Sequence, residues 1–322
     1  MNGVLFASGA GSFTLGSTGA FTLTLGASGL SDQSTAAQNV SLALTLGAAA
    51  SFTVTTGGAL TISGGVNTNG FALTLTSSST GAGTLSGVVS GTGSVISNGT
   101  GLWNLTGPNT YTGGTTLTAG TLVLGNATAL GGAASTLTIT GGTLDSSVAN
   151  LVLTNNNPQA WNGNFTFAGS NALSMGTGAV TLNAGRTVTV SASTLTEGGI
   201  ISGAFALTKQ GAGTLALNGV NTYTGGTGLA AGTLLLGNAK ALGGAAGTLT
   251  ITGGTALDSS VAALVLTNNN PQAWNGDFTF VGSNALSMGT GAVTLGAART
   301  VTVSASPLTE GGIISGAFAL TK

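Results

Sequence analysis

The sequence NTYTGGT stands at residues 109–115 and again at residues 221–227. The similarity extends outward from these seven residues: residues 101–209 align with residues 213–322 after one inserted residue, Ala256, with roughly 85% of the aligned positions identical. A long internal repeat is typical of an array in which near-copies of one structural unit stack on their neighbours. We therefore expect one continuous array made of divergent residues 1–100, a first copy over 101–212 and a second copy over 213–322. Because Lys322 is the counterpart of Lys209, we expect the chain to end within that array.

The composition is apolar and almost without charge. Hydrophobic residues make up 42% of the chain and charged residues only 3%, against about 25% in an ordinary globular domain. The net charge is −1 and the five basic residues are scattered, so the sequence offers no basic surface for nucleic acid. The chain has no His and no Cys, which excludes disulfides, thiolate metal sites and imidazole ligands, and we expect no cofactor.

Short segments of alternating polarity predict an all-β fold. Leu137 and Ile139 alternate with Thr, as do Val188 and Val190, and such a period of two places apolar side chains on one face of a strand. Gly pairs follow nearly every segment, and Gly permits sharp corners.

Strands of four to five residues within a repeat of about 112 residues favour an open-ended stack over a closed sandwich or propeller. We predict a parallel β-solenoid, as a right-handed β-helix with coils of about 20 residues. We expect the following apolar side chains to be buried, and the Thr residues beside them to face outward: Leu137, Ile139, Leu151, Leu153, Phe165, Phe167, Val188 and Val190.

Two stretches around the NTYTGGT motif carry a resemblance to a known family. Residues 105–117 and 119–126, with their second copy at 217–238, resemble the autotransporter-associated β-strand repeat of bacteria. The resemblance implies a secreted or cell-surface protein with a β-helical passenger region, in which the repeat assists folding and export. Both copies keep the motif while neighbouring residues differ, so we assign a structural role to Asn109, Tyr111, Gly113, Gly114, Asn221, Tyr223, Gly225 and Gly226. We expect each tyrosine ring to cover the edge of a coil and each Gly pair to form a corner.

The acidic residues give little support for an enzyme. Asp145 and Asp258 are repeat equivalents, as are Glu197 and Glu310, and five coils of separation place each pair roughly 20 Å or more apart. Within one copy, Asp145 and Glu197 could share a face that Arg186 approaches, but solvated charges or local ion pairs explain them more simply. We therefore expect a protein that is not an enzyme and has no metal site.

Two binding interpretations remain open on the sequence. Trp161 and Trp274 lie beside Asn-rich segments, which would suit either a platform for sugar rings or ordinary turns covered by indole rings. Rows of Thr resemble the flat faces of ice-binding solenoids, although Thr is also a good strand former. For the tryptophans we favour ordinary turns over a sugar platform, and for the threonines we favour strand formation over ice binding.

The sequence thus favours a structural β-solenoid that lies outside the cell or on the bacterial cell surface. Unpaired strand edges at its two ends would allow end-to-end self-association into filaments. The alternative is an adhesin-type passenger that binds glycans or host surfaces. Residues 1–6 lack the features of a secretion signal, and no window of about 20 apolar residues predicts a transmembrane helix.

Overall fold

The computed structural model describes residues 1–78 and 80–322, and within these residues the regular structure consists of β-strands without a helix. No described segment is therefore a helix that could cross a membrane. The chain divides into two compact units, residues 1–159 and 160–322, which are described separately. This division falls inside the first repeat copy.

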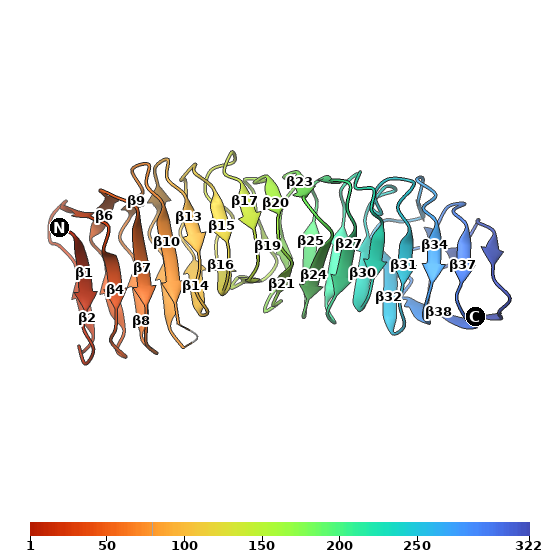
Figure 1. Cartoon of the computed structure of the whole chain (residues 1–322), viewed down its shortest axis with the longest axis horizontal. Coiled ribbons are helices and arrows are strands. Elements are labelled where there is room, and N and C mark those ends of the chain that lie inside the picture. The colour runs from red at the N-terminus through yellow and green to blue at the C-terminus, as the bar shows by residue number, and fades with distance from the viewer. Residues whose placement is uncertain (79) are drawn as a thin grey trace. The chain divides into compact units, whose positions relative to one another are not determined.

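The first unit is a parallel β-solenoid in which each coil places its strands on those of the preceding coil (Figure 1). One sheet stacks β1 (Gly3–Phe6), β4 (Gly29–Asp32), β7 (Ala50–Val54), β10 (Leu73–Ser77), β13 (Val95–Ser97), β15 (Thr115–Leu117) and β17 (Leu137–Ile139). A second stacks β2 (Phe13–Leu15), β5 (Gln38–Val40), β8 (Ala59–Ile62), β11 (Ala82–Leu85), β14 (Leu102–Leu105), β16 (Thr121–Leu124) and β18 (Thr143–Ser146). A third contains β3 (Thr22–Leu25), β6 (Ala43–Leu46), β9 (Val66–Asn67) and β12 (Val89–Ser90). β19 (Leu151–Val152) follows, and β20 (Gln159–Trp161) begins at the last residue of this unit and continues into the second.

The second unit repeats this architecture (Figure 1). One sheet stacks β21 (Phe165–Phe167), β24 (Arg186–Val190), β27 (Leu207–Gln210), β29 (Thr227–Leu229), β31 (Leu249–Ile251), β34 (Gln272–Trp274), β37 (Val293–Leu295) and β40 (Ile314–Ser315). Another stacks β22 (Leu173–Ser174), β25 (Thr194–Glu197), β28 (Thr214–Leu217), β30 (Gly232–Leu236), β32 (Thr255–Ser259), β35 (Phe278–Phe280), β38 (Arg299–Val303) and β41 (Leu320–Thr321). Shorter stacks are formed by β23 (Val180–Leu182) with β26 (Ile201–Ser202), and by β33 (Leu264–Val265), β36 (Leu286–Ser287) and β39 (Leu308–Thr309).

The register keeps apolar side chains stacked inside the coils. Leu117 lies over Ile139 in the first unit, and Phe167 pairs with Val190 in the second, so that consecutive coils continue one apolar column. All eight predicted core residues are buried, and Thr138 and Thr189 beside them are only half-buried. The predicted parallel β-solenoid is therefore confirmed.

Candidate functional site

The two NTYTGGT motifs stand directly before β15 in the first unit and before β29 in the second. The motif residues form the turn that leads into each of these strands, and the strand then pairs with the coils on both sides. Each motif is thus enclosed between a preceding and a following coil of its own unit. The side chains of its asparagine and tyrosine make their contacts along the stack.

Asn109 connects three consecutive coils through its buried amide. Its Oδ1 accepts a hydrogen bond from the Val89 backbone N–H at 2.9 Å, twenty residues earlier. Its Nδ2 donates to the Ala129 carbonyl at 2.8 Å, twenty residues later. Asn221 repeats the arrangement, accepting from the Ile201 N–H at 2.9 Å and donating to the Ala241 carbonyl at 2.7 Å.

These asparagines satisfy backbone groups that a strand ladder would otherwise leave without partners at the turn. An amide is suited to this position because it offers an acceptor and donors on one short, planar side chain. Asn109 and Asn221 are both 1% exposed, so water is not available as a substitute partner.

Tyr111 and Tyr223 are buried completely, rather than covering the edge of a coil. Tyr111 Oη lies 2.5 Å from Thr115 Oγ1, within the same motif, and 3.4 Å from the Ala129 carbonyl. The ring packs against Gly131, where an added methyl group would lie 2.9 Å from two ring carbons. Tyr223 makes the corresponding bond to Thr227 at 2.5 Å. Burial raises the pKa of both tyrosine hydroxyls, and the bonds to Thr partly oppose this effect.

The two glycines of each pair are required for different reasons. Gly114 and Gly226 have φ of 85° and 89°, in the left-handed region that favours glycine. Gly113 lacks a positive φ, but a methyl group there would lie 2.4 Å from the carbonyl carbon of Gly93 in the preceding coil. Gly113 therefore permits close approach of two backbones, whereas Gly114 forms the corner.

Both candidate ligand-binding tryptophans lie inside the solenoid, which corrects their interpretation as a surface. Trp161 is 1% exposed and Trp274 is 3% exposed. Each ring packs edge-on against the phenylalanine four residues later, with ring centroids 5.1 Å apart. A sugar ring stacks on an exposed aromatic face, and neither indole provides one. The alternation in Gln272-Ala273-Trp274, buried at its first and third positions, places the indole on the inward face.

The acidic groups of the second unit are used in local hydrogen bonds. Asp258 accepts from the Ser283 N–H at 2.9 Å and from its hydroxyl at 2.6 Å. Glu310 accepts from Gln272 at 2.7 Å and from the Gly312 N–H at 2.9 Å, while burial raises its pKa. Arg299 donates to the Trp274 carbonyl at 2.9 Å. Among the described residues there is no group of three acidic, His or Cys side chains that could hold a metal ion.

Lys209 is a buried cation that the sequence interpretation passed over. Its side chain is 0% exposed, and Nζ donates to the carbonyls of Gln210, Gly211 and Ala231 at 2.8, 2.7 and 3.0 Å. An ammonium group has three N–H donors, so these three acceptors match its capacity. Burial lowers the pKa of Lys209 to about 8. The signal in the sequence was its position in β27, two residues after the inward Leu207.

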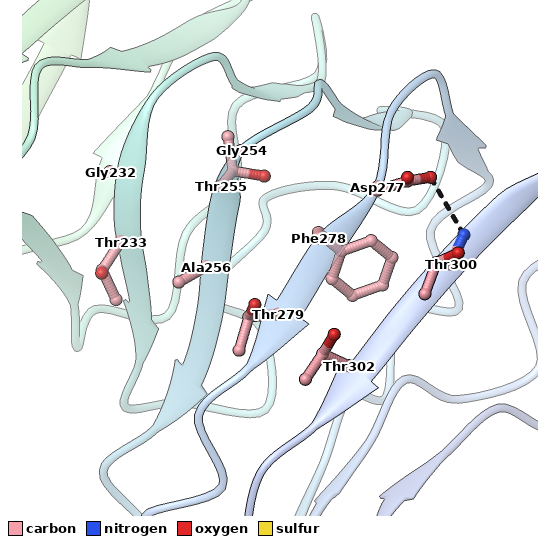
Figure 2. Close-up of a pocket in the computed structure, with 10 residues that line it drawn as sticks. All are labelled: Gly232, Thr233, Gly254, Thr255, Ala256, Asp277, Phe278, Thr279, Thr300 and Thr302. Atoms are coloured by element: carbon pink, nitrogen blue, oxygen red, sulfur yellow. Dashed lines mark hydrogen bonds between the residues drawn. The ribbon is translucent and has the colours of Figure 1, made fainter. Parts of the chain in front are cut away.

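A shallow hollow of about 570 Å³ lies on the outer face of the second unit (Figure 2). Its floor is the row Thr233, Ala256, Thr279 and Thr302, which pair in register across β30, β32, β35 and β38. Asp277 stands at its rim and accepts from the Thr300 N–H at 2.9 Å.

The inserted residue Ala256 changes the outer face at this hollow. In the first copy Thr143 pairs with Thr121 and is half-buried. In the second copy the equivalent Thr255 is 3% exposed and pairs with Gly232, so that Ala256 takes the outward position opposite Thr233. One threonine side chain is thereby removed from the outer face.

Known proteins resemble this chain at the two NTYTGGT motifs. The model of the passenger-associated-transport-repeat family matches residues 95–124 and 207–236, which contain the two NTYTGGT motifs. The chain is 41% identical over 110 residues to the adhesin BmaC autotransporter of Brucella suis biovar 1 (strain 1330). That alignment covers 32% of this chain and 3% of the adhesin. No solved structure matches the chain.

The repeats, the relative and the parallel solenoid agree with the resemblance found in the sequence. The Asn and Tyr side chains that both copies of the motif share lie in the interior, where the asparagines connect coils. The chain carries two segments that match the passenger-associated transport repeat, both built into a parallel β-solenoid, and one part of it is similar to an autotransporter adhesin.

Proposed function

We propose that this protein is a non-enzymatic segment of a bacterial adhesin, exposed outside the cell as a β-solenoid. The observation that carries the proposal is the 41% identity to part of an autotransporter adhesin, in a chain that also contains two transport repeats. The chain spans only 3% of that relative's length, so adhesion is proposed here for the segment itself.

The chemistry of the interior supports a structural role over catalysis. Carboxylates such as Asp258 and Glu310 accept bonds that hold turns, and Lys209 donates to three backbone carbonyls. These groups are committed to neighbouring coils. The outward threonines Thr233, Thr279 and Thr302 provide hydroxyl groups for contact with another surface.

A bead assay tests adhesion directly. Beads coated with the folded chain should attach to cultured mammalian cells several-fold more often than beads coated with heat-unfolded chain at equal density. Competition with soluble glycans would then distinguish a glycan from a protein receptor. Equal attachment of folded and unfolded coats would argue against an adhesive function.

A second proposal is self-association end to end. It is supported by large apolar side chains exposed on the first coil, including Phe13 and Phe21 at 56% and 69%, and by Ile313 at 80% near the other terminus. Light scattering should show mass increasing with concentration. The variant Phe13→Ser/Phe21→Ser should remain monomeric, and a wild-type monomer at all concentrations would contradict this proposal.

Ice binding receives less support. The Thr row that crosses the stacked strands β30, β32, β35 and β38 is interrupted by Ala256. The row through Thr208 and Thr250 is interrupted by Gly228. An ice-binding face needs regular rows on one flat side, and these interruptions break the regular spacing of hydroxyl groups.

A further inference from the structure

The first coils of the solenoid contain a buried carboxylate where an apolar side chain would be expected. Asp32 lies at the inward end of β4, in register with Phe6 on one side and Val54 on the other. Its side chain is 0% exposed. Oδ1 accepts a hydrogen bond from the Ser34 N–H at 2.9 Å, whereas Oδ2 is buried without a partner.

A second oxygen without a partner lies at the same corner of the coil. Gln38 begins β5, 1% exposed and in register with Phe13 and Leu60. Its Nε2 donates to Ser34 Oγ at 3.2 Å and to the Gly11 carbonyl at 3.0 Å, so the amide orientation is fixed. Its Oε1 is buried without a partner. Two acceptors therefore lack a donor, and both side chains connect to Ser34.

No side chain can neutralise Asp32. The first basic residue of the chain is Arg186, and the first unit contains only one other acid, Asp145. The strands paired with β4, which are β1 and β7, contain no titratable side chain, and neither do residues 7–12 and 33–40, which are hydrogen-bonded to one another at this corner. The N-terminal amino group is exposed and donates to the Thr24 carbonyl at 3.1 Å. An ionised carboxylate buried without a counter-charge is so costly that such groups normally take up a proton.

We propose that Asp32 is protonated in the folded protein, so that its carboxyl O–H supplies the donor that this corner lacks, and that folding of the first coils takes up a proton. Protonation changes Oδ2 from an acceptor into a donor, and Gln38 Oε1 is the unpartnered acceptor at the same corner. Burial raises the pKa of Asp32, and the Ser34 N–H only partly opposes this.

The direction of the pH dependence follows from that raised pKa. Below the ordinary Asp pKa of about 3.9, both the folded and unfolded chains hold the proton, and the fold is most stable. As the pH rises above this value, the unfolded chain ionises first, so the stability of the first coils falls until the folded-state pKa is passed. A protein exposed outside the cell would then hold its first coils more tightly in acidic surroundings.

Hydrogen exchange of the whole chain tests the proposal, because coils can open locally. Protection of the β1, β4 and β7 amides, corrected for intrinsic exchange rates, should fall as the pH is raised from about 4 to about 8. If burial raises the pKa of Asp32 by one, the protection of these amides should fall about tenfold over this pH range. Asp32→Asn, which keeps the shape and provides a neutral donor, should show greater protection than wild type at about pH 8 and little change with pH.

The matched control is Asp145→Asn, which removes the other acid of the unit and should keep the wild-type pH dependence of these amides. Infrared spectroscopy gives an independent readout, since a protonated carboxyl band at neutral pH should disappear in Asp32→Asn. Lower protection of Asp32→Asn than of wild type at about pH 8 would overturn the proposal. Protection that depends on added Na⁺ or Ca²⁺ at constant pH would equally overturn it, because a metal ion rather than a proton would then neutralise Asp32.

Discussion

The amide of Asn109 should contribute more to stability than any outward asparagine of the same coils. Replacement by Ala removes the partners of the Val89 N–H and the Ala129 carbonyl, which lie 2.9 and 2.8 Å from the side chain. Leaving one buried polar group without a partner costs about 1–3 kcal/mol. Because two such groups are affected, Asn109→Ala should lower the free energy of unfolding of the first unit by about 2–6 kcal/mol.

Trp103 makes this measurement specific to the first unit, since Trp161 and Trp274 lie in the second. Urea denaturation would be followed by Trp103 fluorescence in a background carrying Trp161→Phe and Trp274→Phe. The control is Asn104→Ala, because Asn104 faces outward and makes only longer bonds of 3.3 and 3.2 Å. It should cost less than about 1 kcal/mol.

Asn109→Asp provides a sharper test. An ionised Asp keeps the acceptor for the Val89 N–H but offers no donor to the Ala129 carbonyl, whereas a protonated one can donate again. Its stability should therefore recover as the pH is lowered, and that of Asn109→Ala should not. Equal destabilisation of the unit by Asn109→Ala and Asn104→Ala would show that the buried amide contributes no more to stability than an outward one.

Three further variants test other contacts by chemical denaturation. Gly113→Ala should lower the free energy of unfolding by about 2 kcal/mol or more, because the added methyl group would collide with the preceding coil. The control Gly132→Ala, whose added methyl group would have its nearest contact at 3.6 Å, should change it by no more than about 0.5 kcal/mol. Similar values for the two variants would contradict this. Lys209→Met should cost about 2 kcal/mol or more and exposed Lys240→Met almost nothing. Because the pKa of Lys209 is lowered to about 8 from its ordinary 10.5, wild-type stability should rise with pH between these values, and a flat profile would exclude the shift. Tyr223→Phe should cost about 1 kcal/mol through loss of its hydroxyl bond, and an unchanged midpoint would assign the tyrosine to packing alone.

The fold was predictable because its main determinants are local. Alternation such as Leu137-Thr138-Ile139 fixes which face of a strand is apolar, and glycines such as Gly114 mark the corners. Since each coil pairs with a near-copy of itself, the same pattern also fixes the register. These features sufficed for the parallel solenoid and for the eight buried core residues.

The contacts of polar and aromatic side chains were less predictable, because they depend on neighbours about 20 residues away. Tyr111 was expected at an edge, but Thr115 and the next coil provide partners for its hydroxyl inside the core. Trp274 was considered for a surface because of the polar segment beside it. Alternation alone places Asp32 and Lys209 inward, although their polarity argues against it, and only the structure shows which partners each of them has.

The hydrogen bonds of Asn109 and Asn221 also restrict how such a sequence can change in length during evolution. Each asparagine bonds to a partner twenty residues before it and to another twenty residues after it. The chain length is therefore fixed within two windows, residues 89–129 and 201–241. A single-residue insertion inside a window would move one bonding partner to the wrong position. The one length difference between the copies, Ala256, lies outside both windows. Duplication of whole coils would keep these bonds intact, whereas small insertions and deletions should accumulate outside residues 89–129 and 201–241, as Ala256 does.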